Sequence, residues 1–186
     1  ELKTVHVRLA GDFEEVRPHF SKVEPRSILN FGLSPAGARA VMEAWGEIFT
    51  VPADKGDIRN LTRTPAVAER DPAWSPDGRR IAFFSDASGE YALEIRDQSG
   101  LGKVRRIPLG DPPSFFYTPV WSPDSRKIAF ADHTQRIRIF EPASGRTTDV
   151  DQEVWSLAPG AGGFEVSWSS DSRWLAYDRT LETGNT

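Results

Sequence analysis

Short apolar segments alternate with turn-forming residues along most of the chain. From Pro72 onward the order is "PAWS", a "PDG" turn, "RRIAFFS", a second turn at "DASGE", the alternating segment "YALEIRDQ" and, after "SGLGK", the segment "VRRIPLG". Short apolar or alternating runs bounded by Gly, Pro, Asp and Ser are typical of strands joined by tight turns. The pattern predicts four antiparallel strands in this stretch.

The same order recurs along the chain. Trp74, Trp121 and Trp168 stand at intervals of 47 residues, each followed by a Ser and a turn, and a fainter copy, "FGLSPAGARAVMEA", carries its Ser at position 34. Units of about 40 to 50 residues with four strands each are typical of β-propeller blades. We therefore predict an all-β fold, a partial β-propeller of about three and a half four-stranded antiparallel blades. The segment "PAGARAVMEAWGEIF" could form a helix in isolation, but its alignment with the other units favours strands.

The repeats divide the chain into units. We place blades at about 28–69, 70–118 and 119–163 and a partial blade at 164–186. Residues 1–27 form an N-terminal strand or linker, because "TVHVRLA" alternates like a strand. The chain does not begin with Met, and we expect it to be a piece of a longer protein.

The repeated phrase has the residues of a tight reversal. In Ser75-Pro76-Asp77-Gly78, Pro presets φ, Asp accepts hydrogen bonds from nearby backbone donors, and Gly supplies a positive φ. A catalytic Asp is not needed three times at a fixed period, whereas a turn is. The predicted turn residues are Ser75, Asp77, Ser122, Asp124, Ser169 and Asp171, and the Trp residues predicted to pack between blades are Trp74, Trp121 and Trp168.

Composition and charge narrow the function. The net charge of −4 offers no broad attraction for nucleic acid or an anionic membrane, and we expect neither as a partner. The chain has no Cys, and its three His residues are far apart in the sequence. It contains no H-E-x-x-H, G-x-S-x-G or P-loop motif. We therefore expect no catalytic residue, no metal site and no cofactor in this chain, and no enzyme activity of its own.

Three aromatic residues do not follow the period. Phe115, Phe116 and Tyr117 come after "GDPPS", in what the pattern indicates is a long connection between two units. They could cap the core beneath that connection, or they could form an exposed aromatic surface for a peptide or a partner domain. The sequence leaves both interpretations open.

The repeat resembles that of known propellers. "WSPDG" followed by "IAF" is similar to the repeat of TolB-like and tricorn-type propellers, and "GEIFTVPADKGDIRNLT" (Gly46 to Thr62) resembles the opening blade of the seven-bladed propeller in tricorn-type proteases. The segments "WSPDSRKIAFAD" and "WSSDSRWLAYDRT" resemble its next blades, so the resemblance covers about 28–183. "LSPAG" departs from it by losing the Asp.

The resemblance implies a function for the parent protein. Tricorn-type proteases are serine peptidases whose propellers are non-catalytic and are thought to steer peptides to a separate protease domain, and no catalytic part aligns here. The expected partners are peptides or other domains of the same polypeptide. The alternative is a TolB-like propeller that serves as a scaffold for protein interactions. We expect a cytoplasmic location, with a periplasmic or secreted one as the alternative.

The incomplete ring leads to one further expectation. Three and a half blades cannot close, so the terminal blades are left with open faces and unpaired strand edges. Such surfaces recruit other strands and apolar surfaces. We expect self-association through the open propeller ends, unless residues 1–27 cover one of them.

Overall fold

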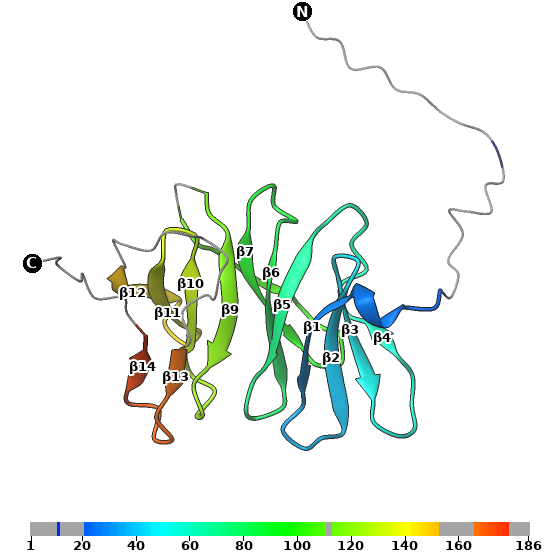
Figure 1. Ribbon diagram of the computed structural model, residues 1–186, viewed down its shortest axis with the longest axis horizontal. Coiled ribbons are helices and arrows are strands. Elements are labelled where there is room, and N and C mark those ends of the chain that lie inside the picture. The colour runs from blue at the N-terminus through cyan, green and yellow to red at the C-terminus, as the bar shows by residue number, and fades with distance from the viewer. Residues whose placement is uncertain (1–10, 12–20, 111–112, 153–165, 179–186) are drawn as a thin grey trace, which may run out of the picture.

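The computed structural model describes residue 11 and residues 21–110, 113–152 and 166–178. This part of the chain is nearly all-β, with one short 3₁₀ turn, η2, at Pro25–Ser27. Three four-stranded antiparallel sheets stand side by side, and a two-stranded hairpin follows them (Figure 1). The prediction of a partial propeller with four-stranded blades is confirmed.

Each sheet contains four strands that follow one another in the chain. The first sheet has β1 (Ile28–Leu33), β2 (Arg39–Ala44), β3 (Glu47–Pro52) and β4 (Arg59–Asn60). The second has β5 (Glu69–Trp74), β6 (Arg80–Ser85), β7 (Ala92–Asp97) and β8 (Arg105–Pro108). The third has β9 (Phe116–Trp121), β10 (Ile128–Asp132), β11 (Arg136–Glu141) and β12 (Arg146–Gln152), and the hairpin has β13 (Val166–Trp168) and β14 (Leu175–Tyr177).

Some boundaries fall slightly ahead of the predicted units. β5 begins one residue before Arg70, and β9 begins three residues before Pro119. In these two strands the repeated phrase starts only at the Pro two residues before Trp74 and Trp121, so the first residues of the strands carry no repeat signal. The segment "TVHVRLA" and the two ends of the predicted partial fourth blade, 164–165 and 179–186, lie outside the described residues.

The first strand of the second and third sheets is bulged. The pairing of β5 with β6 shifts between Arg70 and Ala73, and that of β9 with β10 shifts over the matching stretch. Asp71 and Thr118 occupy the bulges with φ of 55° and 41°, each just before a Pro. A bulge adds a residue to one strand and redirects the side chains beside it.

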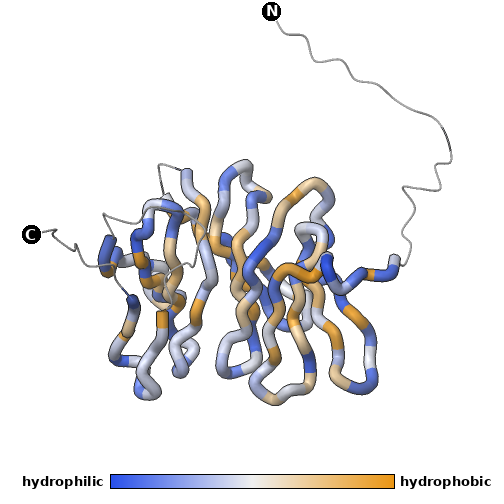
Figure 2. The backbone as a smooth tube through the Cα atoms, in the orientation of Figure 1, coloured by the Kyte–Doolittle hydropathy of each residue, from blue (hydrophilic) through white to orange (hydrophobic). Residues whose placement is uncertain are grey.

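The core lies between the sheets. One apolar cluster, which includes Phe84, Phe116 and Phe130, fills the space between the second and third sheets, and a smaller one around Val41 and Phe83 joins the first and second. The hydrophobic positions lie along the strands, and hydrophilic positions predominate in the connections (Figure 2). Since Ile81 to Phe84 are all fully buried, β6 contacts apolar neighbours on both faces.

One face of the first sheet has no neighbouring sheet in the described part of the chain. Leu29, Phe31 and Leu33 of β1 are 67%, 74% and 70% exposed. In register with them, Met42 and Ala40 of β2 extend the same face. This open apolar face is the physical ground for the expected self-association.

Candidate functional site

The Ser-Pro-Asp turns share one hydrogen-bond pattern. The Ser75 hydroxyl donates to Asp77 Oδ1 at 2.5 Å, and its oxygen accepts from the Arg80 N–H at 2.9 Å. Asp77 Oδ1 also accepts from the Arg79 N–H at 3.1 Å. The equivalent Ser–Asp bond is 2.6 Å long in the two later copies, between Ser122 and Asp124 and between Ser169 and Asp171.

These bonds also set the charge state of the turn carboxylates. Burial alone would raise the pKa of Asp77, but the hydrogen bonds from Ser75 and Arg79 and the nearby Arg80 charge lower that pKa below its ordinary value. The pKa of Asp124 is lowered in the same way. The Ser169 hydroxyl bond is the main cause that lowers the pKa of Asp171. The carboxylates are thus held ionised as hydrogen-bond acceptors within the turns.

The turns also join neighbouring blades. The Asp77 N–H donates to Ser125 Oγ of the next blade at 3.0 Å, and the Asp124 N–H donates to Ser172 Oγ at the same distance. Ser125 and Ser172 occupy the turn position that Gly78 has in the second blade, and their φ values of 60° and 61° are close to its 70°. Their positive φ is strained for a residue with a side chain, and the bond between blades compensates for it.

The repeated Trp residues form a second contact between blades. Trp121 Nε1–H donates to the Ala73 carbonyl at 3.2 Å, and Trp168 Nε1–H donates to the Val120 carbonyl at 3.1 Å. Trp121 is buried, whereas Trp74 and Trp168 are partly buried. Trp74 Nε1 is buried and has no hydrogen-bond partner among the described residues. Among the described residues, the joint between the first two blades therefore lacks both the indole hydrogen bond and the bond from a turn N–H to a Ser hydroxyl, because Gly78 stands where the later blades have Ser125 and Ser172.

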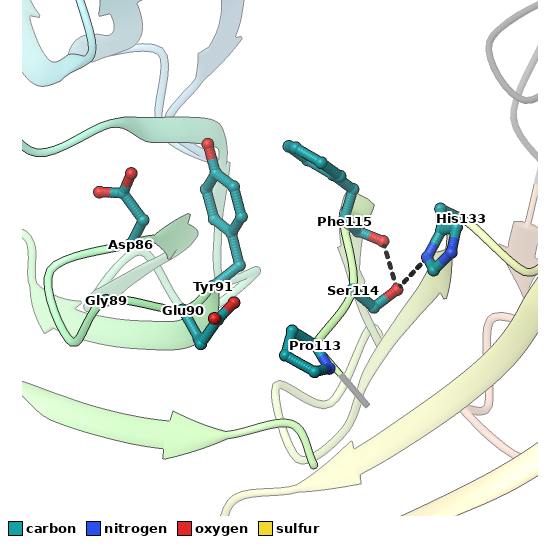
Figure 3. Close-up of a pocket in the computed structure, with 8 residues that line it drawn as sticks. All are labelled: Asp86, Gly89, Glu90, Tyr91, Pro113, Ser114, Phe115 and His133. Carbon is teal, nitrogen blue, oxygen red and sulfur yellow. Dashed lines mark hydrogen bonds between the residues drawn. The ribbon is translucent and has the colours of Figure 1, made fainter. Parts of the chain in front are cut away.

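A cavity opens at the other end of the sheets, between the second and third blades. It has a volume of about 410 Å³ and is lined by Asp86, Gly89, Glu90, Tyr91, Pro113, Ser114, Phe115 and His133 (Figure 3). The first four belong to the connection between β6 and β7, and the others precede β9 or follow β10. Its volume lies in the range of small-ligand sites.

Aromatic rings form one wall of this cavity. The rings of Tyr91 and Phe115 come from different blades, and their centroids are 5.3 Å apart with a tilt of 46°. The Arg70 guanidinium lies 5.7 Å from the Tyr91 centroid, 5.8 Å from that of Phe115 and 5.5 Å from that of Tyr117. Arg70 and Tyr117 directly precede the two bulges, so the bulged strands position the cation against these rings.

A network of polar side chains from the first two blades contacts Arg70 and its neighbour Asp71. Its guanidinium contacts Asp71 Oδ2 at 3.4 Å, and the Asp71 N–H donates to Glu43 Oε2 at 2.9 Å. The Asn30 amide donates to both Glu43 Oε2 and Asp71 Oδ1, at 2.8 and 2.9 Å. These contacts link the first blade to the aromatic cluster and compensate in part for the polar contacts that are missing at its joint.

The opposite wall is polar. Ser114 Oγ lies 2.6 Å from His133 Nδ1 (Figure 3), and the backbone N–H of His133 donates to the Phe115 carbonyl at 2.8 Å. A Ser–His pair is two thirds of a hydrolytic triad, but no carboxylate hydrogen bond reaches His133 in the described part of the chain. The Ser114 hydroxyl is also within 3.1 Å of the Phe115 carbonyl. The contact between Ser114 and His133 holds the imidazole in the wall of the cavity.

The aromatic residues singled out from the sequence fall in different places. Phe115 is 52% exposed at the cavity, whereas Phe116 is 2% exposed in the core. Phe116 and Tyr117 belong to β9, so the prediction that all three lie in a connection is wrong. The sequence placed no functional residue at Asp86, Glu90 or Tyr91, because they follow no motif and meet Phe115 only through the packing of two blades.

The described residues hold no group of three or more His, Asp or Glu side chains placed to bind a metal ion. Within the same part of the chain, no helix has the length and apolar character needed to cross a membrane.

Comparison with known proteins supports the fold. No protein-family model matches the chain, and no curated protein matches it. Among solved structures, it is similar to a putative TolB from Agrobacterium tumefaciens, with a TM-score of 0.59 and 22% identity over 80% of this chain and 53% of that one. It is also similar to TolB from Acinetobacter baumannii, with a TM-score of 0.59 and 15% identity over 85% of this chain and 39% of that one.

Both structures are much longer than this chain, which spans about half of the first and less than half of the second. At these identities the likeness concerns the fold. The chain has the fold of part of a TolB-like β-propeller.

Proposed function

We propose that this chain is part of a non-catalytic propeller that serves as a scaffold for protein interactions, and that it binds an extended peptide segment in the cavity between the second and third blades. One observation carries the proposal: Tyr91 and Phe115, from two blades, form an aromatic wall beside an open cavity with polar groups around it. Aromatic-lined grooves with a few polar groups are a recurring way to bind extended peptides.

The rest of the molecule supports a rigid platform for such binding. The Ser-Pro-Asp turns and the Trp contacts lie at the joints and fix adjacent blades to each other. The cavity lies at the end of the sheets opposite to these turns, so binding there leaves the joints undisturbed. Connections placed on a rigid scaffold commonly carry the binding residues of a domain.

The proposal can be tested with an immobilised library of random twelve-residue peptides. Peptides that bind the chain should no longer bind the Phe115→Ala variant, because Phe115 is half exposed and the substitution removes one of the two rings of the aromatic wall. Leu101→Ala removes an apolar side chain that is 77% exposed, from the connection between β7 and β8 away from the cavity, and serves as the control. Recovery of no peptide, or equal binding to both variants, would refute the proposal.

A second candidate is the peptide-steering propeller of a tricorn-type serine peptidase. The observation that favours it is the resemblance of Gly46 to Thr62 to the opening blade of that propeller. The full gene product would then hydrolyse a mixture of fluorogenic peptides, while this chain alone would not. If the full product is inactive, or if activity of this chain survives repurification and disappears on Ser114→Ala, the candidate fails.

A further inference from the structure

We infer that the cavity recognises a basic side chain, arginine in preference to lysine, on the segment that it binds. The inference rests on the proposed function and names the chemistry of its ligand. The cavity is lined by two carboxylates, Asp86 and Glu90, and by no lysine or arginine. Both come from the connection that also carries Tyr91 (Figure 3).

The aromatic wall is suited to a cation. The face of an aromatic ring carries partial negative charge and attracts cations within about 6 Å of its centroid. The centroids of Tyr91 and Phe115 are 5.3 Å apart, which leaves no room for a planar group between the rings. A ligand cation would therefore lie against the cavity side of the rings, where Phe115 is half exposed.

Arg70 shows that this cluster accommodates a guanidinium. Its charge lies within 5.5 to 5.8 Å of three ring centroids, and the Asp71 carboxylate balances that charge at 3.4 Å. The flat guanidinium can stack on rings, which an ammonium group cannot do. This geometry is the reason to expect arginine ahead of lysine.

The carboxylates supply the balancing charge. Asp86 Oδ1 accepts from the Ala68 N–H at 2.8 Å, which fixes the carboxylate in place. Neither Asp86 nor Glu90 forms an ion pair with another described residue. Because the charge of Asp71 balances that of Arg70, the carboxylates of Asp86 and Glu90 leave the cavity with a net negative charge. The Ser114–His133 wall adds hydrogen-bonding groups without a carboxylate. An anionic segment would be repelled by the same groups.

The experiment uses labelled peptides of glycine, serine and proline that differ only in one central residue, which is arginine, lysine, glutamine or glutamate. Fluorescence anisotropy should give the tightest binding for the arginine peptide, then lysine, glutamine and glutamate. We expect the arginine peptide to bind roughly tenfold more tightly than the glutamine peptide, as an exposed cation–π contact and an exposed ion pair each contribute several-fold. The preference should weaken as salt is raised.

Charge-removing variants assign the effect to the cavity. Asp86→Asn/Glu90→Gln should abolish the preference for arginine over glutamine. Asp54→Asn/Asp57→Asn, which removes two exposed charges from the connection between β3 and β4, should keep it. Circular dichroism melts establish that both variants are folded.

The outcomes separate this inference from the proposed function. If none of the four peptides binds and the peptide library also yields nothing, the proposed function and the inference both fail. If peptides bind with equal affinity for arginine and glutamine, or if the preference persists in Asp86→Asn/Glu90→Gln, only the inference fails.

Discussion

The indole N–H groups of Trp121 and Trp74 offer a matched test of what holds the blades together. Trp121 Nε1–H donates to Ala73 across the joint between the second and third blades, whereas Trp74 Nε1 at the preceding joint has no hydrogen-bond partner in the part of the chain that the structure describes. Replacing either residue by 3-benzothienylalanine exchanges the N–H for sulfur and keeps the shape of the ring. The change therefore removes a hydrogen bond at one joint and an unsatisfied donor at the other.

The two variants should change the unfolding free energy in opposite directions, or the Trp74 variant should leave it unchanged. A hydrogen bond contributes a net of about 0.5–1.5 kcal/mol, so the Trp121 variant should lose about 1 kcal/mol of unfolding free energy. The Trp74 variant should be unchanged or more stable, because a buried donor without a partner is itself unfavourable. With a urea dependence of about 2 kcal/mol per M, the loss at Trp121 lowers the urea midpoint by roughly 0.5 M.

Urea unfolding followed by far-UV circular dichroism measures both midpoints. The slope with urea must stay unchanged for the comparison to report stability alone. Equal destabilisation at the two positions would refute the reasoning, because it would mean that the indole N–H contributes nothing specific to the joint. A larger loss at Trp74 would refute it as well.

Three further predictions concern other parts of the molecule. Burial raises the pKa of Glu69 from 4.5 to about 7, so the folded state binds a proton more tightly than the unfolded state and stability falls as the pH rises from about 4.5 to 7. The unfolding free energy lost over this pH range approaches about 3 kcal/mol, and thermal melts at several pH values measure it. Glu69→Gln should remove this pH dependence of stability. The same pH dependence in the variant would rule out Glu69 as its source. Asp124→Ala should cost about 0.5–1.5 kcal/mol in a urea melt and leave peptide binding unchanged, since it removes the bonds from Ser122 and Arg126; lost binding in the folded variant would contradict this. The open face around Phe31 should make the chain self-associate, and light scattering that finds only the monomer mass of 20.7 kDa would exclude this.

The period of the sequence accounts for most of the fold. Strands separated by Gly, Pro, Asp and Ser at a fixed spacing predicted four-stranded sheets, because each turn needs particular backbone angles and each strand needs apolar neighbours. The first strand of each blade was harder to delimit. Phe116 and Tyr117 follow "GDPPS" and fall outside the repeat period, which predicts a connection. The structure extends β9 over them, and the bulge at Thr118 interrupts the alternation that would mark a regular strand.

The cavity could not be predicted in the same way. Tyr91 and Phe115 come from connections of different blades, and their proximity depends on how the two sheets pack. The position of Arg70 depends on a bulge, which no sequence motif marked. The difference between Trp74 and Trp121 was also hidden, because it depends on the acceptor in the neighbouring blade and not on the Trp itself.

The most direct test of the central claim maps the bound peptide on the molecule. Amide chemical-shift mapping by NMR reports the binding site while a peptide recovered from the library is titrated in. We expect the largest shifts at Gly89, Tyr91, Ser114, Phe115 and His133, around the cavity between the second and third blades. Shifts confined to the Ser-Pro-Asp turns or to the open face of the first sheet would contradict it.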